Sequence, residues 1–554
     1  MKKLNKVIAS ALMGVALVSC NDLDTVYEGS YVTSETKSDV YEINPEMAVA
    51  GVTGITANFS RYLATISTST SRIDYDYGYA GVMLGLDHQT ADMNSRYIGY
   101  NWFNDWAAFS DINPNGDKNL CVWKNEYNQI FVANAVLSSI PEDSESEELQ
   151  LFRAQAHGFR AFNYWVLAQL FQFNYQGNED KPCVPIITAE NAELAASEGA
   201  IRATVKEVYD QILSDLNTAI EKSEATTLRI GSYVPSKPRR MLYIDALYGL
   251  RARVNLTMGK YAEAAADAKK AIALSSATPL SIQECSKPGF GSMSDHNWMW
   301  GIAIAITDRV VTSGIINNPS MLCTFCGNGY VPVGCWRAIA TDLWDAIPST
   351  DVRKGWWLDD DYQSPILTDA QQAYLDEFGY GTITDSDASL LPHTNVKFDS
   401  YNSVIGQTDN ANDIPLMRIE EMYYIAAEGL AMSNQLAEAS DLINNFEQTY
   451  RNPNFINTAS TPEAFQEMIW NKRRVEFWGE GLSYFDLLRL NKGVDRRSSG
   501  CVSVWRYNIQ PKNPVLIMMI PEDEMQANPA LNLKAPAGEP NGNNEQGIRP
   551  VAGV

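Results

Sequence analysis

The chain has 554 residues, of which 45% are hydrophobic, so it is long enough for several cores and is not a disordered chain. Its formal net charge of -24 argues against binding of nucleic-acid phosphates, and against binding of anionic lipid through a basic surface. An acidic body of this kind fits a neutral ligand.

The chain begins with a targeting segment. Lysines precede an apolar run, Val7 to Val18, that is too short to cross a bilayer. The run leads into Ser19-Cys20, and this end resembles a bacterial lipobox. The resemblance implies removal of residues 1–19 and lipidation of Cys20. No later apolar run is long enough for a transmembrane helix, so we expect a body that is anchored by lipid alone.

The first half of the chain is predicted to be helical. A helix starts near Glu46, and apolar residues recur every three or four positions in 123–140, 152–173 and 205–222. The segment 243–274 predicts a helical hairpin, with a turn at Gly259-Lys260-Tyr261 and alanines at close spacing after it. This spacing matches a tetratricopeptide repeat, in which small side chains let paired helices approach closely.

A second hairpin of the same kind is predicted from Glu420 to Leu442. A long segment, rich in Gly, Pro, Asp and aromatic residues, separates the two, and its run 301–307 is a candidate strand. Folding must therefore bring the hairpins together around this insertion. The predicted parts are a signal peptide (1–19), a lipidated tether (20–45), an N-terminal helical part (46–274), the insertion (275–415), a C-terminal helical part (416–526) and a flexible tail (527–554).

An aromatic stretch near residue 100 is the candidate ligand site. Its rings alternate with amides and charged groups, and their periodicity is poor for a core helix. Flat rings beside polar groups suit an extended neutral ligand. The candidate ligand-binding residues are Asp92, Arg96, Tyr97, Asn101, Trp102, Trp106 and, from the insertion, Trp336.

A metal site is only weakly indicated. The side chains of Asp111, Asn113, Asn115 and Asp117 match the first half of a calcium loop, but Val122 stands where a bidentate Glu is expected. An Asx-rich turn is the alternative. Cys323, Cys326 and Cys335 have no fourth residue at a spacing typical of a zinc ligand. One disulfide between two of these three cysteines is possible. We expect no cofactor, with calcium as the alternative.

The stretch from Trp470 to Arg489 places many charges among aromatic residues. Arg473 and Glu476 form a possible i,i+3 pair, and Asp486 and Arg489 form another. Charges this close to apolar surface need partners, because burying a lone charge is costly. The stretch is therefore interpreted as a structural ion-pair cluster.

This stretch also resembles the signature R-x-x-E-x-x-x-E-G-x-R-x-x-D-L-x-R of the SusD/RagB family of outer-membrane lipoproteins. The residues that fill the pattern are Arg473, Glu476, Glu480, Gly481, Asp486, Leu487 and Arg489. Ser483 stands where the family has its second Arg, which puts in doubt an ion pair at that position. Three other stretches, 160–185, 415–428 and 520–529, resemble further family segments in the same order.

The resemblance implies a mainly α fold in which tetratricopeptide-like hairpins form a scaffold and the loop-rich insertion carries short strands. It implies a lipoprotein on the cell surface of a Bacteroidetes-type bacterium, anchored in the outer membrane. Such a protein captures an oligosaccharide and delivers it to a TonB-dependent SusC-like transporter. An oligopeptide ligand is the alternative, and a surface glycan hydrolase is a more distant one. No nucleophile, metalloprotease or phosphate-binding motif is present in the sequence, so we expect no enzyme and name no catalytic residue.

Overall fold

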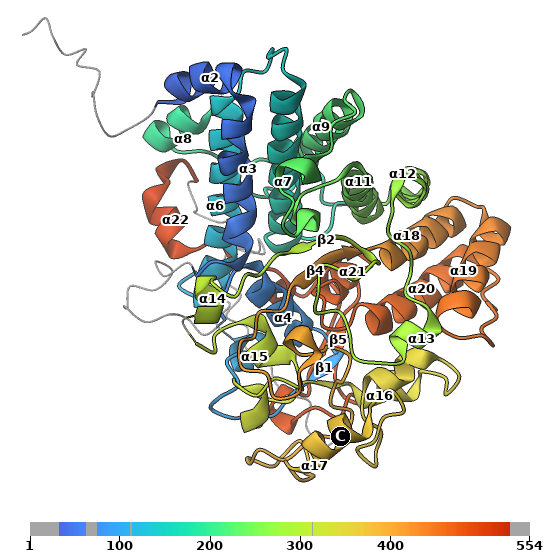
Figure 1. The fold of residues 1–554 in the computed structure, drawn as a ribbon. Helices are drawn as coiled ribbons and strands as arrows, with labels where there is room; N and C mark the ends of the chain where they lie inside the picture. The colour runs from blue at the N-terminus through green and yellow to red at the C-terminus, as the bar shows by residue number, and fades with distance from the viewer. Residues whose placement is uncertain (1–32, 63–74, 111–113, 313, 532–554) are drawn as a thin grey trace, which may run out of the picture.

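Long helices form one side of the molecule and a loop-rich body forms the other (Figure 1). The computed structural model describes residues 33–62, 75–110, 114–312 and 314–531. The predicted signal peptide, Cys20 and the tail beyond residue 531 lie outside these ranges. No helix in the described ranges is long and apolar enough to cross a membrane.

The longer helices are α2 (Ser34–Ile43), α3 (Val49–Ala57), α4 (Tyr79–Gln89), α6 (Asp117–Ser139), α7 (Glu147–Leu170), α8 (Ala192–Glu198), α9 (Val205–Glu224), α11 (Ile244–Met258), α12 (Tyr261–Leu274), α17 (Asp369–Asp376), α18 (Ile419–Met432), α19 (Leu436–Tyr450), α20 (Pro462–Glu476), α21 (Ser483–Arg489) and α22 (Glu522–Ala527). The short helices are α5 (Asn104–Ala107), α10 (Ile230–Tyr233), α13 (Ile282–Cys285), α14 (Arg309–Thr312), α15 (Asn318–Leu322) and α16 (Thr341–Asp345). The strands are β1 (Met93–Asn94), β2 (Trp298–Ile302), β3 (Ala338–Ile339), β4 (Ile414–Arg418), β5 (Val494–Asp495) and β6 (Asn508–Ile509).

The long helices pack in an array that follows the chain. Helix α7 packs between α6 and α9, α9 contacts α11, and α11 pairs with α12. Helix α7 begins where the Ser146 side chain accepts a hydrogen bond from Leu149 N–H, and it is buried almost all round, as its apolar sequence predicts. The helix predicted over 123–140 begins earlier, at Asp117, because a carboxylate is favourable in the first turn.

Both predicted hairpins are confirmed. Helices α11 and α12 form the first, and α18 and α19 form the second. Gly259 ends α11 with a left-handed φ of 74°, and its N–H bonds back to Leu256. Helix α12 packs directly on α18, so the array continues across the insertion as expected (Figure 1).

The two ends of the insertion are joined by a strand pair. β2 pairs antiparallel with β4, with Trp298 opposite Arg418 and Ile302 opposite Ile414. The strand predicted at 301–307 is therefore displaced toward the N-terminus, because Trp298 to Ile302 is wholly buried and matches the pattern of a core strand. The other strands are two-residue pairs, β1 with β3 and β5 with β6.

One further expectation needs correction, and one question that the sequence left open is answered. The polar segment 20–45, predicted as a tether, includes α2, whose cap is the Thr33 side chain. Cys323, Cys326 and Cys335 are buried free thiols, so the disulfide left open by the sequence is not formed. Burial raises the pKa of Cys326 to about 12, which keeps this thiol protonated and inert.

The contact between α12 and α18 yields a stability prediction. A Cβ at Gly429 of α18 would lie 2.5 Å from the carbonyl oxygen of Tyr261 and 2.9 Å from the Ala265 Cβ. We expect Gly429→Ala to separate these helices and to lower the free energy of unfolding by about 1–3 kcal/mol, as overpacking does. Gly54→Ala is the control, because no neighbouring atom lies within 4 Å of a Cβ there. Equal melting temperatures for the two variants would contradict the close packing.

Candidate functional site

The aromatic stretch near residue 100 divides into a buried half and an exposed half. Phe103 and Trp106 are fully buried, whereas Tyr97 is 62% exposed and Tyr100 59% exposed. Trp102 is half-buried and packs edge-on against Tyr330 at 5.7 Å. The expectation that Trp106 faces a ligand is therefore wrong. Its ring fills the core beside α4, where a Cβ at Gly85 would collide with it.

Arg96 and Asn101 hold the backbone of this stretch and do not reach its surface. Arg96 is fully buried, and its Nε donates to the Thr382 carbonyl at 3.0 Å and its Nη2 to the Ser389 hydroxyl at 3.1 Å. The Asn101 amide donates to the Ser95 hydroxyl and to the Arg96 carbonyl, both at 2.9 Å. Both residues were predicted to bind ligand, but their polar groups are already bonded within the protein. They are positioning residues.

Arg96 thereby joins the aromatic stretch to loop 380–389, which sequence reasoning missed. Tyr380 is 51% exposed and stacks on Tyr362, with ring centroids 4.4 Å apart and an interplanar angle of 23°. The Tyr362 hydroxyl donates to the Gly381 carbonyl at 2.9 Å, and this hydrogen bond fixes the Tyr362 ring on which Tyr380 stacks. Threonine, serine and aspartate side chains of the same loop are exposed. The sequence signal that could have indicated this exposed ring is the run Gly379-Tyr380-Gly381, which lies in a segment rich in hydroxyl and carboxylate side chains.

We use the name aromatic face for the exposed rings of Tyr97, Tyr100 and Tyr380, together with the Tyr362 ring beneath Tyr380. These rings lie on two segments that Arg96 fastens together, so the segments are held in place without a ligand. Exposed rings bordered by hydroxyl and carboxylate groups can stack on apolar faces of a neutral ligand while the polar groups bind its hydroxyls.

Two other predicted ligand residues belong to the interior. Asp92 is buried and forms an ion pair with Arg474 of α20, with Oδ1 and Nη2 2.6 Å apart. Trp336 is fully buried, and its indole N–H donates to the Ala388 carbonyl at 3.0 Å. Trp336 therefore supports loop 380–389 from below and does not form its surface.

A separate pocket with a volume of about 480 Å³ is lined mostly by polar groups of the insertion. It contains Asp295, Asp399 and the half-buried Tyr401. Burial raises the pKa of Asp295 to about 6. The pocket offers hydroxyls and carboxylates, but only one aromatic ring.

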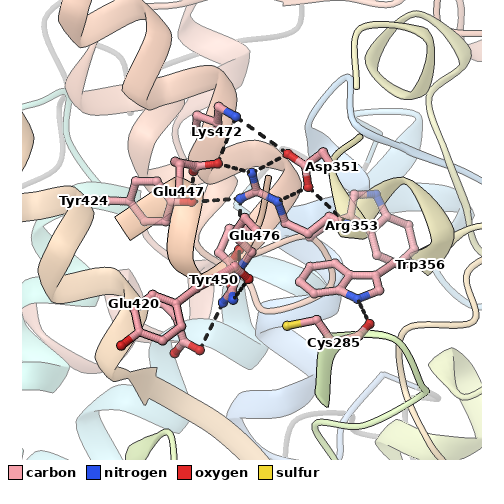
Figure 2. A network of polar contacts seen from close by, with 12 residues as sticks. Cys285, Asp351, Arg353, Trp356, Glu420, Tyr424, Glu447, Tyr450, Lys472 and Glu476 are labelled. Carbon is pink, nitrogen blue, oxygen red and sulfur yellow. Dashed lines mark hydrogen bonds and ion pairs between the residues drawn. The ribbon is translucent and has the colours of Figure 1, made fainter. Parts of the chain in front are cut away.

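The C-terminal stretch forms a buried ion-pair cluster centred on Glu476 (Figure 2). Its carboxylate accepts hydrogen bonds from Arg353 at 3.0 Å, Arg418 at 3.0 Å and Arg451 at 2.8 Å. Arg353 also binds Asp351 at 2.7 Å and Glu447 at 2.8 Å. Each of these side chains is buried, so the ion pairs are almost unscreened by water.

A second group of the cluster surrounds Asp486 of α21. Its carboxylate binds Arg473 at 2.6 Å and Arg489 at 2.7 Å, and the second pair is the predicted i,i+3 pair. Arg489 also binds Glu428 at 2.5 Å. The predicted pair of Arg473 with Glu476 is wrong, because Arg473 lies toward α21 while Glu476 lies toward the insertion.

The charges around Glu476 and Glu480 balance. The cations are Arg353, Lys397, Arg418, Arg451 and Lys472, and the carboxylates are Asp351, Glu420, Glu447, Glu476 and Glu480. Burial alone would raise the pKa of Glu476, but Arg451 and Arg418 outweigh burial and hold this pKa well below its usual range. A paired carboxylate of this kind is not available for proton transfer, which supports the structural interpretation.

The weak metal candidates gain no support. Asp111 and Asn113 lie outside the described residues, and Asp117 is the first residue of α6. Within the described ranges, no group of three or more His, Cys, Asp or Glu side chains is placed to hold a metal ion.

Two family models match the chain. One, described as "Starch-binding associating with outer membrane" and SusD-like, matches residues 44–237, and the SusD family model matches residues 383–545. The chain belongs to the SusD family. The unmatched middle of this SusD-family chain, residues 238–382, contains α11, α12 and most of the insertion, whose loops include Tyr362 and Tyr380.

This SusD-family protein is similar in sequence to one curated relative and similar in fold to several solved structures. SusD-like protein P38 of Formosa agariphila is 24% identical over 413 residues, which span 70% of this chain and 75% of that protein. The structure of a SusD-like carbohydrate binding protein from Bacteroides vulgatus has a TM-score of 0.69 at 21% identity, covering 88% of this chain and 96% of that one. Surface glycan-binding protein A of Bacteroides thetaiotaomicron, solved in complex with laminarihexaose, has a TM-score of 0.62 at 15% identity, covering 88% and 98%.

The ion-pair cluster of this SusD-family protein should make its stability acid-sensitive. The pKa values of Glu476, Glu480 and Asp486 are all lowered, because their arginine and lysine partners outweigh burial. Their contribution is therefore fully present above the unfolded values of about 4 and is lost as pH falls through the lower folded values. We expect thermal melts from pH 7 to pH 3 to show a steep loss of stability on the acid side.

Asp486→Asn should lower the melting temperature at pH 7, since breaking a buried ion pair costs about 3–5 kcal/mol. The melting temperature of this variant should also fall less between pH 7 and pH 3 than that of the unchanged protein. The matched control is Asp361→Asn in an exposed loop, which should change neither quantity. An unchanged acid dependence in Asp486→Asn would contradict the assignment.

Proposed function

We propose that this protein captures an oligosaccharide at the cell surface through the aromatic face. The observation that carries the proposal is the set of exposed rings, Tyr97, Tyr100 and Tyr380, on segments that the buried Arg96 fastens together. Sugar rings present apolar C–H faces that stack on tyrosine, and their hydroxyls bond to neighbouring carboxylates and hydroxyls. The prior fixing of the rings reduces the entropy lost on binding.

A neutral glycan also agrees with the charge of the chain. A net charge of -24 favours neutral ligands over acidic ones. A structural neighbour was solved with laminarihexaose, which supports a glucan as the first ligand to test. An oligopeptide ligand would use the same rings and is an outcome that the binding test distinguishes.

We assign the protein a binding role and not a catalytic one. Glu476, Glu480 and Asp486, the most strongly engaged carboxylates of the family signature, are buried and ion-paired. A glycosidase needs two carboxyl groups facing one scissile bond, with one of them protonated. The three signature carboxylates have lowered pKa values and face arginines instead.

Delivery to a TonB-dependent outer-membrane transporter completes the proposal. The family description of association with the outer membrane supports the location. We propose that lipid on Cys20 anchors the body and that α2 lies near the start of the folded part. Anchoring by one lipid-bearing residue leaves the aromatic face free to meet both ligand and transporter.

Binding should depend on the exposed tyrosines. Tyr97→Ala, Tyr100→Ala and Tyr380→Ala should each weaken affinity for a laminari-oligosaccharide roughly tenfold, because a stacked ring contributes over 1 kcal/mol. Calorimetry with a panel of glucans and peptides measures the effect. Phe131→Ala is the control, since Phe131 is a 70% exposed ring on α6, outside the two segments that carry the aromatic face. Undiminished binding in all three variants would contradict the assignment of the site to the aromatic face. Asp295→Asn, in the separate polar pocket, would then be the next variant to measure.

Transporter delivery is tested in native membranes. The affinity-tagged full-length protein should co-purify with an outer-membrane β-barrel transporter, and a Cys20→Ala variant should be lost from the membrane fraction. Tyr97→Ala should retain the transporter while binding the glycan more weakly. Purification without any transporter, with glycan binding intact, would reject delivery and leave the binding role in place.

A further inference from the structure

Arg337 is a buried arginine whose guanidinium has no hydrogen-bond acceptor and no carboxylate partner among the residues that the structure describes. It immediately precedes β3, and its carbonyl accepts hydrogen bonds from the Asn395 backbone N–H at 2.8 Å and from the Asn395 side chain at 3.1 Å. Its side chain is 0% exposed. None of its three nitrogens, Nε, Nη1 and Nη2, has an acceptor at hydrogen-bond distance among the described residues.

The other buried arginines of the described ranges differ from Arg337. One group is neutralised by carboxylates and consists of Arg160, Arg253, Arg353, Arg418, Arg451, Arg473 and Arg489. A second group donates to backbone carbonyls and consists of Arg96, Arg153 and Arg496. A guanidinium with neither kind of partner keeps most of the desolvation cost of a buried charge, and the Phe103 ring, 5.9 Å from the guanidinium carbon of Arg337, offsets only part of that cost.

Two polar groups near Arg337 also lack hydrogen-bond partners among the described residues. The Tyr77 hydroxyl and both ring nitrogens of His88 are buried and lack partners in the described part of the chain. His88 stacks on the Phe103 ring at 5.4 Å, and the Arg337 guanidinium carbon lies 5.9 Å from the same ring. Arg337 and His88 therefore both lie against Phe103, and both Tyr77 and His88 are near enough to Arg337 for its charge to lower their pKa values.

These neighbours do not supply a negative charge. Burial lowers the pKa of Arg337, and the groups that oppose this effect are Cys335 and Tyr77. Burial raises the pKa of Cys335 to about 11 and that of Tyr77 further, so both are neutral at pH 7. Burial and the charges of Arg337 and Arg496 lower the pKa of His88 well below its usual value, so this ring is neutral as well.

We propose that Arg337 and the Tyr77 hydroxyl bind one small monovalent anion of about the size of chloride. One negative charge compensates the one unpaired cation, whereas a divalent anion would leave an excess. The anion must be small, because Phe103, Trp106 and His88 fill the surrounding interior and are buried. The site lies under the buried half of the aromatic stretch, and a bound anion stabilises the base on which the aromatic face rests.

The anion is tested by the stability of the whole protein. The melting temperature should rise and saturate when sodium gluconate is replaced by sodium chloride or bromide at constant ionic strength, because only the folded state binds the ion. Gluconate is too large for the site. Arg337→Met should abolish this anion dependence. Arg153→Met is the matched control: Arg153 is also buried without a carboxylate, but it donates to the carbonyls of Leu137 and Ile140, so this variant should be less stable and keep the dependence.

Crystals grown in bromide give an independent measurement that does not need the variant to fold. An anomalous peak within hydrogen-bond distance of the Arg337 guanidinium and the Tyr77 hydroxyl is expected. A melting temperature that is indifferent to the anion, an equal dependence in Arg337→Met, or the absence of the bromide peak would each overturn the proposal. Glycan binding is measured separately, so loss of the anion site and loss of the proposed function are distinguishable.

Discussion

The structure depends on the burial of one carboxylate among three arginines. Glu476 ends α20, and its partners come from the insertion (Arg353), from β4 (Arg418) and from the residue after α19 (Arg451). None of these charges is tolerable in the interior alone, since removing water from an ion costs several kcal/mol. The charges therefore have to be buried together, and this requirement fastens four distant segments at one point (Figure 2).

The same stretch connects the cluster to the candidate ligand site. The Trp478 indole N–H donates to the Asp92 carbonyl at 2.9 Å, and Gly481 N–H donates to the Asp87 carboxylate at 3.0 Å. Asp92 directly precedes β1, and Arg96 follows β1 to fasten loop 380–389. The family signature thus holds the end of α4 and the start of β1, and the chain after β1 carries Tyr97 and Tyr100.

The aromatic residues show how far local sequence can predict a site. Tyr97 and Trp106 both lie among aromatic and polar residues in the sequence, so local composition does not predict which of the two rings is exposed. Tyr97 is exposed, whereas Trp106 is buried because Gly85 on α4 leaves room for its ring. Tyr362 and Tyr380 were missed because their stack joins residues 18 positions apart in an irregular loop, where no periodicity indicates which side chains meet.

The sequence by itself determined the helical hairpins, the long insertion and the need for a buried ion-pair cluster. Those features depend on local periodicity and on the cost of lone charges, both of which can be read along the chain. Only the tertiary structure decided which charges pair, which rings reach the surface, and that Arg337 has no partner among the described residues. These outcomes depend on contacts between segments hundreds of residues apart, such as Asp92 with Arg474, and local sequence does not encode their geometry.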